Sequence, residues 1–413
     1  MDDSNHKFYS QSLEDLYQIN RDLSVKLIAD LEPEDMVIQT EDFVSPVKWH
    51  LGHTTWFFEQ FILIPYQKNF KFFDKSFNFI FNSYYNAAGE FNPKNKRGYL
   101  NRPLTSEVLM YRKYIDDKMM TLIPKLKEKI KNFDFLIKLG INHEQQHQEL
   151  MLMDIKNIFF NNYLKPVFKN AKNKTKVKKK PENFVSRKTV FENYGYIGKD
   201  FCYDNELPSS NTSIEPFILS PFVTNLDWKN FIKAGGYENY KFWLSDGWDF
   251  VKRNTIKKPM YWLDEEYIFT LNGIKKINDK LPVSHISFYE ADAYARFKKK
   301  RLPSEIEVEY FLKNSKKSGN FLENGFFNEI QDDKFSAYGN LWVWTSSNYL
   351  PFKNYIPYKN KLNEYNSKFM CNQFVLKGGS YGTPKSHIRS SYRNFYYPSD
   401  RWQFCGLKSA ESI

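Results

Sequence analysis

Apolar residues recur at helical spacing through roughly the first 165 residues of the chain. In SLEDLYQINRDLSVKLIADL the apolar positions follow the repeat of an amphipathic helix, at Leu13, Leu16, Ile19, Leu23 and Leu27. Further helices are predicted from Ser45-Pro46 through WHLGHTTWFFEQFIL, over about 105–130, where TSEV approximates a capping box, and over about 133–160. Four such helices with one long connection, residues 66–104, predict a helical bundle.

The pattern changes in the second half of the chain. Residues 190–413 contain short β-prone runs, Gly-Gly pairs and many Trp and Tyr residues, with only a few short helical patterns, of which ISFYEADAYARFKKK is the clearest. These features predict an irregular α+β domain rich in loops. The basic stretch KNAKNKTKVKKKPENFVSRK has little that could pack in a core, which indicates a solvated linker. We therefore predict a helical domain over 1–165, a linker over 166–189 and a second domain over 190–413.

Composition narrows the class of protein. Hydrophobic residues make up 41% and aromatic residues 18% of the chain, which is enough for full cores and excludes wholesale disorder. No apolar run approaches the ~18 residues of a membrane span, and the polar N-terminus does not resemble a secretory signal. The three cysteines, Cys202, Cys371 and Cys405, fit no disulfide framework. We expect a soluble, cytoplasmic protein.

The net charge of +12 raises the possibility of nucleic-acid binding. Much of the excess charge lies in the predicted linker, however, and no motif of alternating aromatic and basic residues accompanies it. Neither nucleic acid nor a membrane is therefore expected as a partner. The sequence does not indicate an oligomeric state.

The motif HEQQH carries the clearest chemistry. His143 and His147 stand four residues apart, so on a helix both side chains project from one face. Two imidazoles in this arrangement can bind one metal ion at about 2 Å from each nitrogen. His53 lies in another predicted helix of the bundle, and facing helices of bundles commonly build metal sites. Three histidines would leave open positions, as in non-haem iron oxygenases, although His50 competes with His53 as the third ligand.

The same motif has a rival interpretation. HEQQH matches the H-E-x-x-H signature of zinc proteases, in which the glutamate, here Glu144, acts as general base. No third-ligand extension of the type HxxGxxH follows His147, and the next histidine is His285. Because imidazole suits Fe, Zn, Cu and Ni, ligand type alone does not identify the metal.

Blocks around these histidines resemble a known family. KWHLGHTTWFFEQF, FNSYYNAAG and INHEQQHQELMLMDIK resemble the DinB-like half of the EgtB-type sulfoxide synthases (hercynine oxygenases) of ergothioneine biosynthesis. LPVSHISFYEADAYARFKKKRLPSEIEVE, GNLWVWTSSNY and FVLKGGSYGTPKSHIRSSYRNFYYPSDRWQFCGL resemble the formylglycine-generating-enzyme (sulfatase-modifying factor) domain. The resemblance implies two domains: an all-α four-helix DinB-like bundle, then an irregular α+β C-type-lectin-like (FGE-sulfatase) domain.

The resemblance also implies a reaction. The family consists of non-haem iron(II)- and O₂-dependent oxidoreductases that join a cysteine-type thiol to C2 of the hercynine imidazole and oxidise the sulfur to a sulfoxide. The implied cofactor is Fe(II), and the implied partners are hercynine, cysteine or γ-glutamylcysteine, and O₂. Binding to a metal lowers the pKa of a thiol and brings the reacting groups together, which suits an open site.

Individual roles follow from the resemblance. His53, His143 and His147 match the iron ligands of the family, and Gln146 matches a position that contacts hercynine or a bound water. Tyr84 and Tyr85 match a tyrosine pair found in one branch, where a phenol can donate a proton. The alternative for Gln146 is a polar residue at the edge of the core, and the alternative for each tyrosine is ordinary aromatic packing.

Further residues match substrate-binding positions. Arg97 and Arg102 are candidates to bind the carboxylate of the thiol substrate, with a solvated basic loop as the alternative. Asn394 matches a residue that holds the amino-acid end of hercynine. Phe395 and Tyr396 follow it and could offer aromatic faces to the trimethylammonium group.

The chain departs from the family pattern at two places. Branches that use γ-glutamylcysteine have an acidic residue about two places after the asparagine, where this chain has Tyr396, so free cysteine is the favoured donor. Cys371 and Cys405 are not a close pair, so no sulfatase activation is expected. The alternatives are a sister enzyme acting on histidine (ovothiol type) or a selenium donor (selenoneine type), a zinc-dependent DinB-like thiol transferase, and a non-catalytic binding module.

Overall fold

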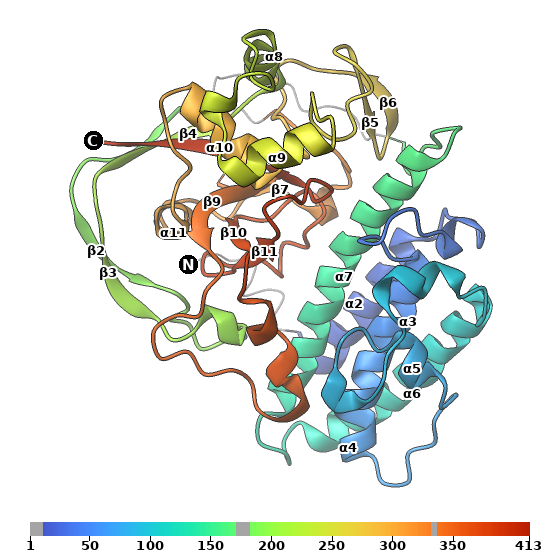
Figure 1. The fold of residues 1–413 in the computed structure, drawn as a ribbon. Helices are drawn as coiled ribbons and strands as arrows, with labels where there is room; N and C mark the ends of the chain where they lie inside the picture. Colours follow the sequence, from blue (N-terminus) through green and yellow to red (C-terminus); the bar gives the residue numbers. More distant parts are fainter. Residues whose placement is uncertain (1–10, 171–181, 332–336) are drawn as a thin grey trace. The chain divides into compact units, whose positions relative to one another are not determined.

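The computed structural model describes residues 11–170, 182–331 and 337–413, and these form two compact units (Figure 1). The first unit ends at Phe168 and also includes the short segment Lys359–Glu364. The second unit contains Lys169–Tyr358 and Tyr365–Ile413. Part of the predicted basic linker, residues 171–181, lies outside the described residues. Each unit is considered by itself.

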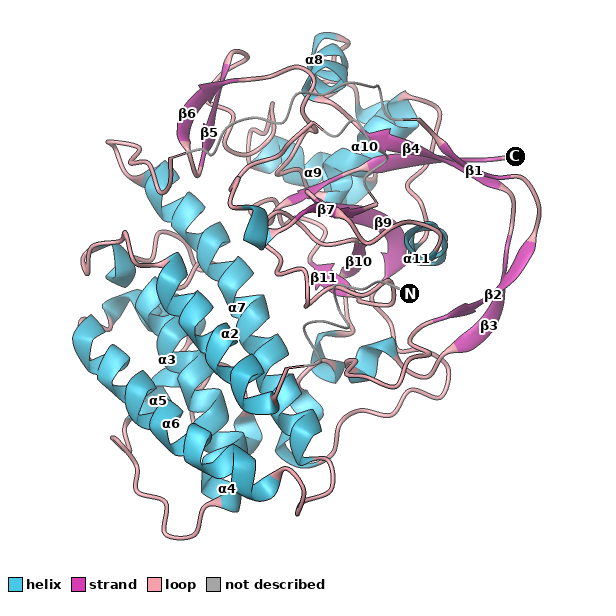
Figure 2. Ribbon diagram, turned by 180° about the vertical axis from the view of Figure 1, so that it is seen from behind, coloured by secondary structure: helices cyan, strands magenta, loops and turns pink. Residues whose placement is uncertain are grey.

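The first unit is a helical bundle, as predicted. Its long helices are α2 (Leu13–Leu27), α3 (Val47–Phe58), α6 (Thr105–Leu126) and α7 (Phe133–Asn161). Helix α3 packs against α6 and α7, and α2 packs against the same two helices, as Figure 1 and Figure 2 show from opposite sides. Helix α3 continues through a π-helical turn, Glu59–Leu63, into α4 (Ile64–Tyr66), and α5 (Phe77–Phe81) lies in the long connection. In the described part of the chain, no helix combines the length and apolarity needed to cross a membrane.

The start of α6 differs in detail from the predicted capping box. The first helical residue is Thr105 and the N-cap is Leu104, whose side chain cannot accept a hydrogen bond. Glu107 supplies the other half of the motif, since its carboxylate accepts the backbone N–H of Leu104 at 2.6 Å. The threonine of TSEV therefore begins the helix instead of capping it, and the helix ends at Leu126, earlier than predicted.

Two glycines let neighbouring elements approach the helices that carry the histidines. A Cβ atom on Gly52 of α3 would lie 2.2 Å from the Phe81 ring of α5, and one on Gly140 of α7 would lie 2.4 Å from the Phe58 ring of α3. Aromatic rings therefore lie directly against the backbone at both positions. The close approach at Gly52 brings the end of α5 next to His53, the following residue of α3.

The second unit combines short strands and short helices. Its sheets have the orders β11-β10-β9-β12 and β1-β4-β13, with three two-stranded pairs, β2-β3, β5-β6 and β7-β8. The strands are β1 (Phe184–Ser186), β2 (Val190–Tyr194), β3 (Ser210–Ile214), β4 (Phe217–Phe222), β5 (Tyr267–Thr270), β6 (Gly273–Lys276), β7 (Gly319–Asn320), β8 (Tyr338–Gly339), β9 (Trp342–Asn348), β10 (Phe374–Lys377), β11 (Asn394–Tyr396), β12 (Cys405–Gly406) and β13 (Lys408–Ser412). The strands and loops of this unit are coloured separately in Figure 2.

In the described part of this unit, four α-helices accompany these sheets: α8 (Asn225–Lys233), α9 (Ser245–Arg253), α10 (Phe288–Phe297) and α11 (Glu305–Lys313). The predicted helix in ISFYEADAYARFKKK is α10, which begins with a complete capping box between Ser287 and Glu290. Strands and helices alternate irregularly along this unit. The predicted order of an all-α region followed by an irregular α+β region is confirmed.

Candidate metal centre

Helices α3 and α7 bring three histidines together inside the bundle. His53, His143 and His147 each place a ring nitrogen within 4.8 Å of the others, and all three side chains are buried. The Nε2 atoms of His53 and His143 are 3.2 Å apart. The i, i+4 spacing on α7 accounts for the pair, and the packing of α3 against α7 adds the third imidazole.

The tautomer of His53 follows from its outer contact. Its Nδ1 lies 2.6 Å from the carbonyl oxygen of Phe81, which can only accept a hydrogen bond. Nδ1 therefore carries the proton, and in the neutral ring Nε2 keeps its lone pair. Since that lone pair faces another imidazole nitrogen, a cation between the rings would satisfy both. This donor set fits a transition-metal ion.

Burial keeps the three rings neutral. It lowers the pKa of His143 to about 3, and it lowers the pKa of His53 and His147 well below the ordinary value, with further lowering from the neighbouring imidazoles. Metal ions bind neutral imidazole, so a cluster that stays unprotonated is ready to bind a metal across the physiological pH range.

Aromatic side chains hold the ring of His53 in place. The ring of His53 stacks between Trp49, at 4.7 Å and 9°, and Trp56, at 5.5 Å and 20°. These tryptophans lie four residues before and three residues after the histidine, so one helix face carries all three rings. Phe57 covers His143 with ring centroids 4.4 Å apart. Trp49, Trp56 and Phe57 thus fix the orientation of the histidine rings and surround them with apolar surface.

His50 is not placed as a ligand, which decides between it and His53. Its Nδ1 lies 2.8 Å from Nδ1 of His147, and its Nε2 lies 2.8 Å from Oδ2 of Asp154. Both ring nitrogens are therefore engaged in hydrogen bonds. His50 therefore contacts the outer nitrogen of His147 and is not a member of the three-histidine cluster.

Glu144 is not placed as a general base either. Its carboxylate accepts hydrogen bonds from Arg21, Arg112 and Ser24, and its side chain is fully buried. Burial alone would raise the pKa of Glu144, but the two arginines and the Ser24 hydroxyl outweigh it and hold the pKa below the ordinary value. A base in a zinc protease must face the metal-bound water, whereas this carboxylate is held by an ion-pair network. The position of the Glu144 carboxylate is therefore inconsistent with the zinc-protease interpretation.

The predicted proton donors lie in the loop after α5. Tyr84 and Tyr85 stack with ring centroids 4.6 Å apart, and the hydroxyl of Tyr84 donates to that of Tyr85 at 3.5 Å. Tyr85 is fully buried and its ring lies 5.7 Å from Trp56, which itself stacks on His53. Asn82 holds the loop, since its side chain binds both the N–H and the carbonyl of Tyr85. One aromatic ring therefore separates the tyrosine pair from a histidine of the cluster.

The two predicted arginines have different surroundings. Arg97 is buried, its guanidinium lies 3.3 Å above the Trp49 ring, and its Nη1 donates to the Ser45 hydroxyl. Burial lowers the pKa of Arg97 to about 9. Its Nε has no hydrogen-bond partner in the described part of the chain. Arg102 is exposed and donates to the carbonyl of Asn101.

The other predicted substrate residues are divided between the units. Gln146 is half-buried on α7, directly before His147. Asn394, Phe395 and Tyr396 form β11 of the second unit, which pairs with β10. All three are half-buried, and Phe395 stacks on Tyr349 with ring centroids 4.1 Å apart.

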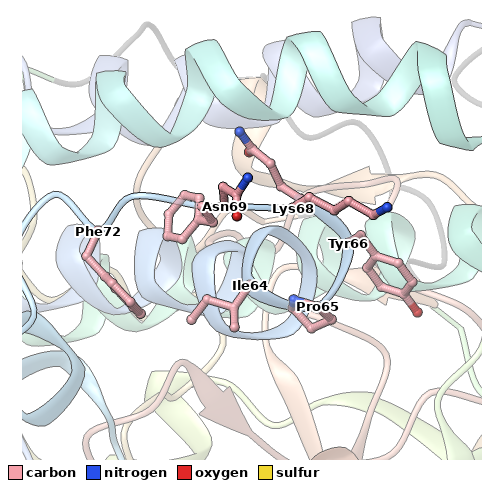
Figure 3. Close-up of a pocket in the computed structure, with 8 residues that line it drawn as sticks. Ile64, Pro65, Tyr66, Lys68, Asn69 and Phe72 are labelled. Carbon is pink, nitrogen blue, oxygen red and sulfur yellow. The ribbon is translucent and has the colours of Figure 1, made fainter.

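A surface hollow elsewhere in the bundle is separate from the histidines. It has a volume of about 430 Å³ and is lined by the segment from Ile64 to Phe72, at the end of α4 (Figure 3). Its labelled side chains, among them Tyr66 and Lys68, come from one short stretch of chain. None of the clustered histidines lines it.

Sequence reasoning missed several residues around the cluster. Asp154 lies seven residues after His147, so a helical face through both was a signal that could have identified it. Trp49 and Trp56 lie on the face of His53 and could have been found by the same spacing. The carbonyl of Phe81 carried no such signal, because any residue has one.

Comparison with known proteins agrees with this architecture. Residues 16–151 match the DinB superfamily, and residues 172–335 match the sulfatase-modifying factor enzyme 1-like domain. The hercynine oxygenases of Mycobacterium tuberculosis and Mycolicibacterium smegmatis are each 28% identical to the chain, over 239 and 242 residues. These alignments cover 51% of this chain and 56% of each relative, so the chain spans little more than half the length of these relatives.

Among solved structures, PvdO from Pseudomonas aeruginosa is 18% identical and covers 59% of this chain and 100% of its own, with a TM-score of 0.38. That likeness is too weak to support a detailed comparison. The resemblance predicted from the sequence is confirmed by the two domain matches and by the relatives. The chain thus has a DinB-like helical region, matched over residues 16–151, followed by a region matched to the sulfatase-modifying factor enzyme 1-like domain over residues 172–335, and it is similar to hercynine oxygenases.

Proposed function

We propose that this protein is an iron(II)- and O₂-dependent sulfoxide synthase that joins a cysteine-type thiol to C2 of hercynine. The observation that carries the proposal is the cluster of three buried, neutral imidazoles in a chain similar to hercynine oxygenases. The C2–H and S–H bonds are broken, and a C–S bond and an S=O bond form. One oxygen atom of O₂ enters the sulfoxide, and the other leaves as water with both hydrogens. Since O₂ accepts all four electrons, no further reductant is needed.

In this proposal His53, His143 and His147 hold the iron. Three protein ligands leave coordination positions open for the substrates, and when bound the metal supplies thiolate activation and O₂ chemistry. The apolar walls formed by Trp49, Trp56 and Phe57 limit the access of water to these ligands. Neutral imidazoles leave the net charge of the metal available to stabilise a thiolate.

Tyr84 and Tyr85 are proposed to hold and deliver a proton. Their mutual hydrogen bond joins the two phenols, and the fully buried position of Tyr85 protects that proton from exchange with solvent. General acid catalysis of this type typically contributes about 10²–10⁴ in rate. We expect Tyr85→Phe to lower kcat by a factor in that range while metal binding is unchanged, as measured by single-turnover kinetics.

Arg97 is proposed to bind the carboxylate of the thiol substrate. It is a buried guanidinium whose Nε has no hydrogen-bond partner in the described residues, and it lies against a tryptophan that stacks on a proposed ligand. Such a group favours a planar anion. Arg102, Gln146, Asn394, Phe395 and Tyr396 are proposed as further substrate contacts on the strength of the family resemblance. Free cysteine is the proposed donor, and the cytoplasm is the proposed location because all three cysteines are unpaired.

The test is anaerobic reconstitution with Fe(II), followed by hercynine, either cysteine or γ-glutamylcysteine, and air, with products identified by mass spectrometry. A hercynine–thiol sulfoxide is expected, with cysteine preferred. His143→Ala should abolish it, whereas His387→Ala, at an equally buried histidine outside the cluster, should not.

Failure to form a coupled product with either thiol, despite bound iron, would contradict the proposed substrates. Histidine in place of hercynine, and a selenium donor in place of the thiol, would then be tested. Thiol transfer without O₂ consumption would instead indicate the zinc-dependent alternative.

A further inference from the structure

A buried chain of hydrogen bonds runs outward from one of the three clustered histidines. Nδ1 of His147 lies 2.8 Å from Nδ1 of His50, and Nε2 of His50 lies 2.8 Å from Oδ2 of Asp154. The three side chains are 8%, 2% and 1% exposed, respectively. These hydrogen bonds join His50 of α3 to two positions on α7 that lie seven residues apart.

The acceptor at the end of the chain determines the position of each proton. Oδ2 of Asp154 also accepts the backbone N–H of Ser45 at 2.9 Å, so this oxygen acts as an acceptor. Nε2 of His50 therefore donates to it, and in a neutral imidazole Nδ1 must then be the acceptor. Nδ1 of His147 donates to that acceptor, which leaves Nε2 of His147 with the lone pair that a metal requires.

We infer that His50 and Asp154 are positioning residues that fix the tautomer and orientation of His147 as a metal ligand. A carboxylate linked to the outer nitrogen of a ligand also makes that ligand a stronger donor. The inference rests on the metal site proposed above, but not on the proposed substrates. Neither residue touches the metal in this arrangement.

The outer nitrogens of His53 and His147 have different partners, and this difference sets the expected loss of metal affinity. The outer nitrogen of His53 donates to a backbone carbonyl, which no side-chain substitution removes. The hydrogen bonds through His50 to Asp154 support His147 alone. Loss of these bonds should therefore weaken one proposed ligand and leave the other two in place. Loss of an outer partner of this kind typically costs about 10–100-fold in metal affinity.

The experiment measures the affinity of the full-length protein for Co(II) by competition with a chelator, together with the visible spectrum of the bound Co(II). Asp154→Asn keeps the shape of the side chain and an oxygen for the N–H of Ser45, but removes the negative charge. We expect affinity to fall by about 10-fold and the Co(II) bands to shift. Asp116→Asn is the matched control, since it alters a carboxylate of the bundle that binds Arg21 and Tyr17, and it should leave both readouts unchanged.

A double substitution shows whether Asp154 acts on His147 through His50 or independently of it. His50→Phe keeps a ring in place but removes both nitrogens, and Asp154→Asn should then cause little additional loss of affinity. If the His50→Phe variant does not fold, His50→Gln is used in its place. The oxygen of this glutamine can accept a hydrogen bond from His147, but the side chain cannot reproduce both hydrogen bonds of His50. The order of affinities should be wild type, then Asp154→Asn and His50→Gln, then His50→Phe.

Two results would overturn the inference. One is wild-type affinity and spectrum in both single variants. The other is a full additional loss from Asp154→Asn in the His50→Phe background, which would show that Asp154 acts through Ser45 alone. If His143→Ala abolishes Co(II) binding while the His50 and Asp154 variants bind normally, the metal site stands and the positioning role fails. If the wild-type protein binds no Co(II), both are contradicted.

Discussion

Two buried polar clusters share helix α7 of the first unit and differ in how their charges are satisfied. Glu144 belongs to an ion-pair cluster with Arg21 and Arg112, in which each charged group meets an opposite charge inside the protein. His143, the preceding residue, belongs to the histidine cluster, in which neutral rings turn nitrogen atoms toward one another. The charges of the first cluster are paired within the protein, whereas a cation would satisfy the nitrogen atoms of the second.

This difference indicates which part of a motif carries function. In HEQQH, the glutamate lies in the ion-pair cluster and the two histidines lie in the proposed metal site, although all three fall within five residues. Adjacent helix positions are rotated by about 100°, so neighbouring residues face different surroundings. The predictions below test the separation of the two clusters.

The largest effect is expected on removing the charge of the ion-pair cluster. Glu144→Gln leaves two buried guanidinium groups without a counter-charge from this residue, so we expect the free energy of unfolding to fall by about 3–5 kcal/mol. Urea denaturation measures it. The control Asp117→Asn breaks an exposed pair with Lys113 and should cost less than about 1 kcal/mol. Equal costs for the two variants would show that the Glu144 cluster is not structural.

The second effect is stabilisation by metal. Ligand at 100 times its Kd stabilises the folded state by about 2.7 kcal/mol if it binds only that state. We expect Fe(II) under anaerobic conditions to raise the free energy of unfolding by this amount in the wild-type protein. The gain should vanish in His143→Ala. Retention of the gain in that variant would place the metal elsewhere.

The third effect is a difference in pH dependence between the clusters. The folded-state pKa of His143 is lowered to about 3, so below about pH 6.5 the unfolded chain binds a proton that the folded chain does not, and stability falls with pH. The lowered pKa of Glu144 instead gives stability that is present above about pH 4.5 and is lost as pH falls through the folded-state pKa.

Of the two clusters, only the histidine cluster should therefore contribute to the slope between pH 6 and 4.5. Without metal, His143→Gln should reduce the slope of unfolding free energy against pH by up to about 1.4 kcal/mol per pH unit. Denaturant titrations at several pH values measure this slope. An unchanged slope would mean that His143 is already protonated, or accessible to protons, in the folded protein.

Much of the bundle could be predicted from the sequence, because amphipathic spacing and the i, i+4 histidines depend on residues close in the chain. The partners of Glu144 could not, since Arg21 lies 123 residues away and Arg112 lies 32 residues away. For the same reason helical spacing alone could not distinguish His50 from His53, and only the family resemblance favoured His53 before α3 was seen packed against α7. The end of α6 was missed because helix ends depend on local capping that the pattern fixes only approximately.

The second unit was predictable only in outline. Short β-prone runs indicate strands, but the order β11-β10-β9-β12 joins segments that are distant in the sequence, and β12 pairs with β9 in parallel. No local pattern specifies such pairings. The stacking of Phe395 on Tyr349 depends on this sheet and therefore could not be predicted from the sequence either.

The most direct test of the metal site is the stoichiometry of Fe(II) after anaerobic reconstitution and removal of loosely bound ions, measured by elemental analysis. The wild-type protein and His387→Ala are expected to retain about one iron per chain, and His143→Ala is expected to retain essentially none. Iron absent from the wild-type protein, or retained in full by His143→Ala, would contradict the assignment of the three histidines as a metal centre.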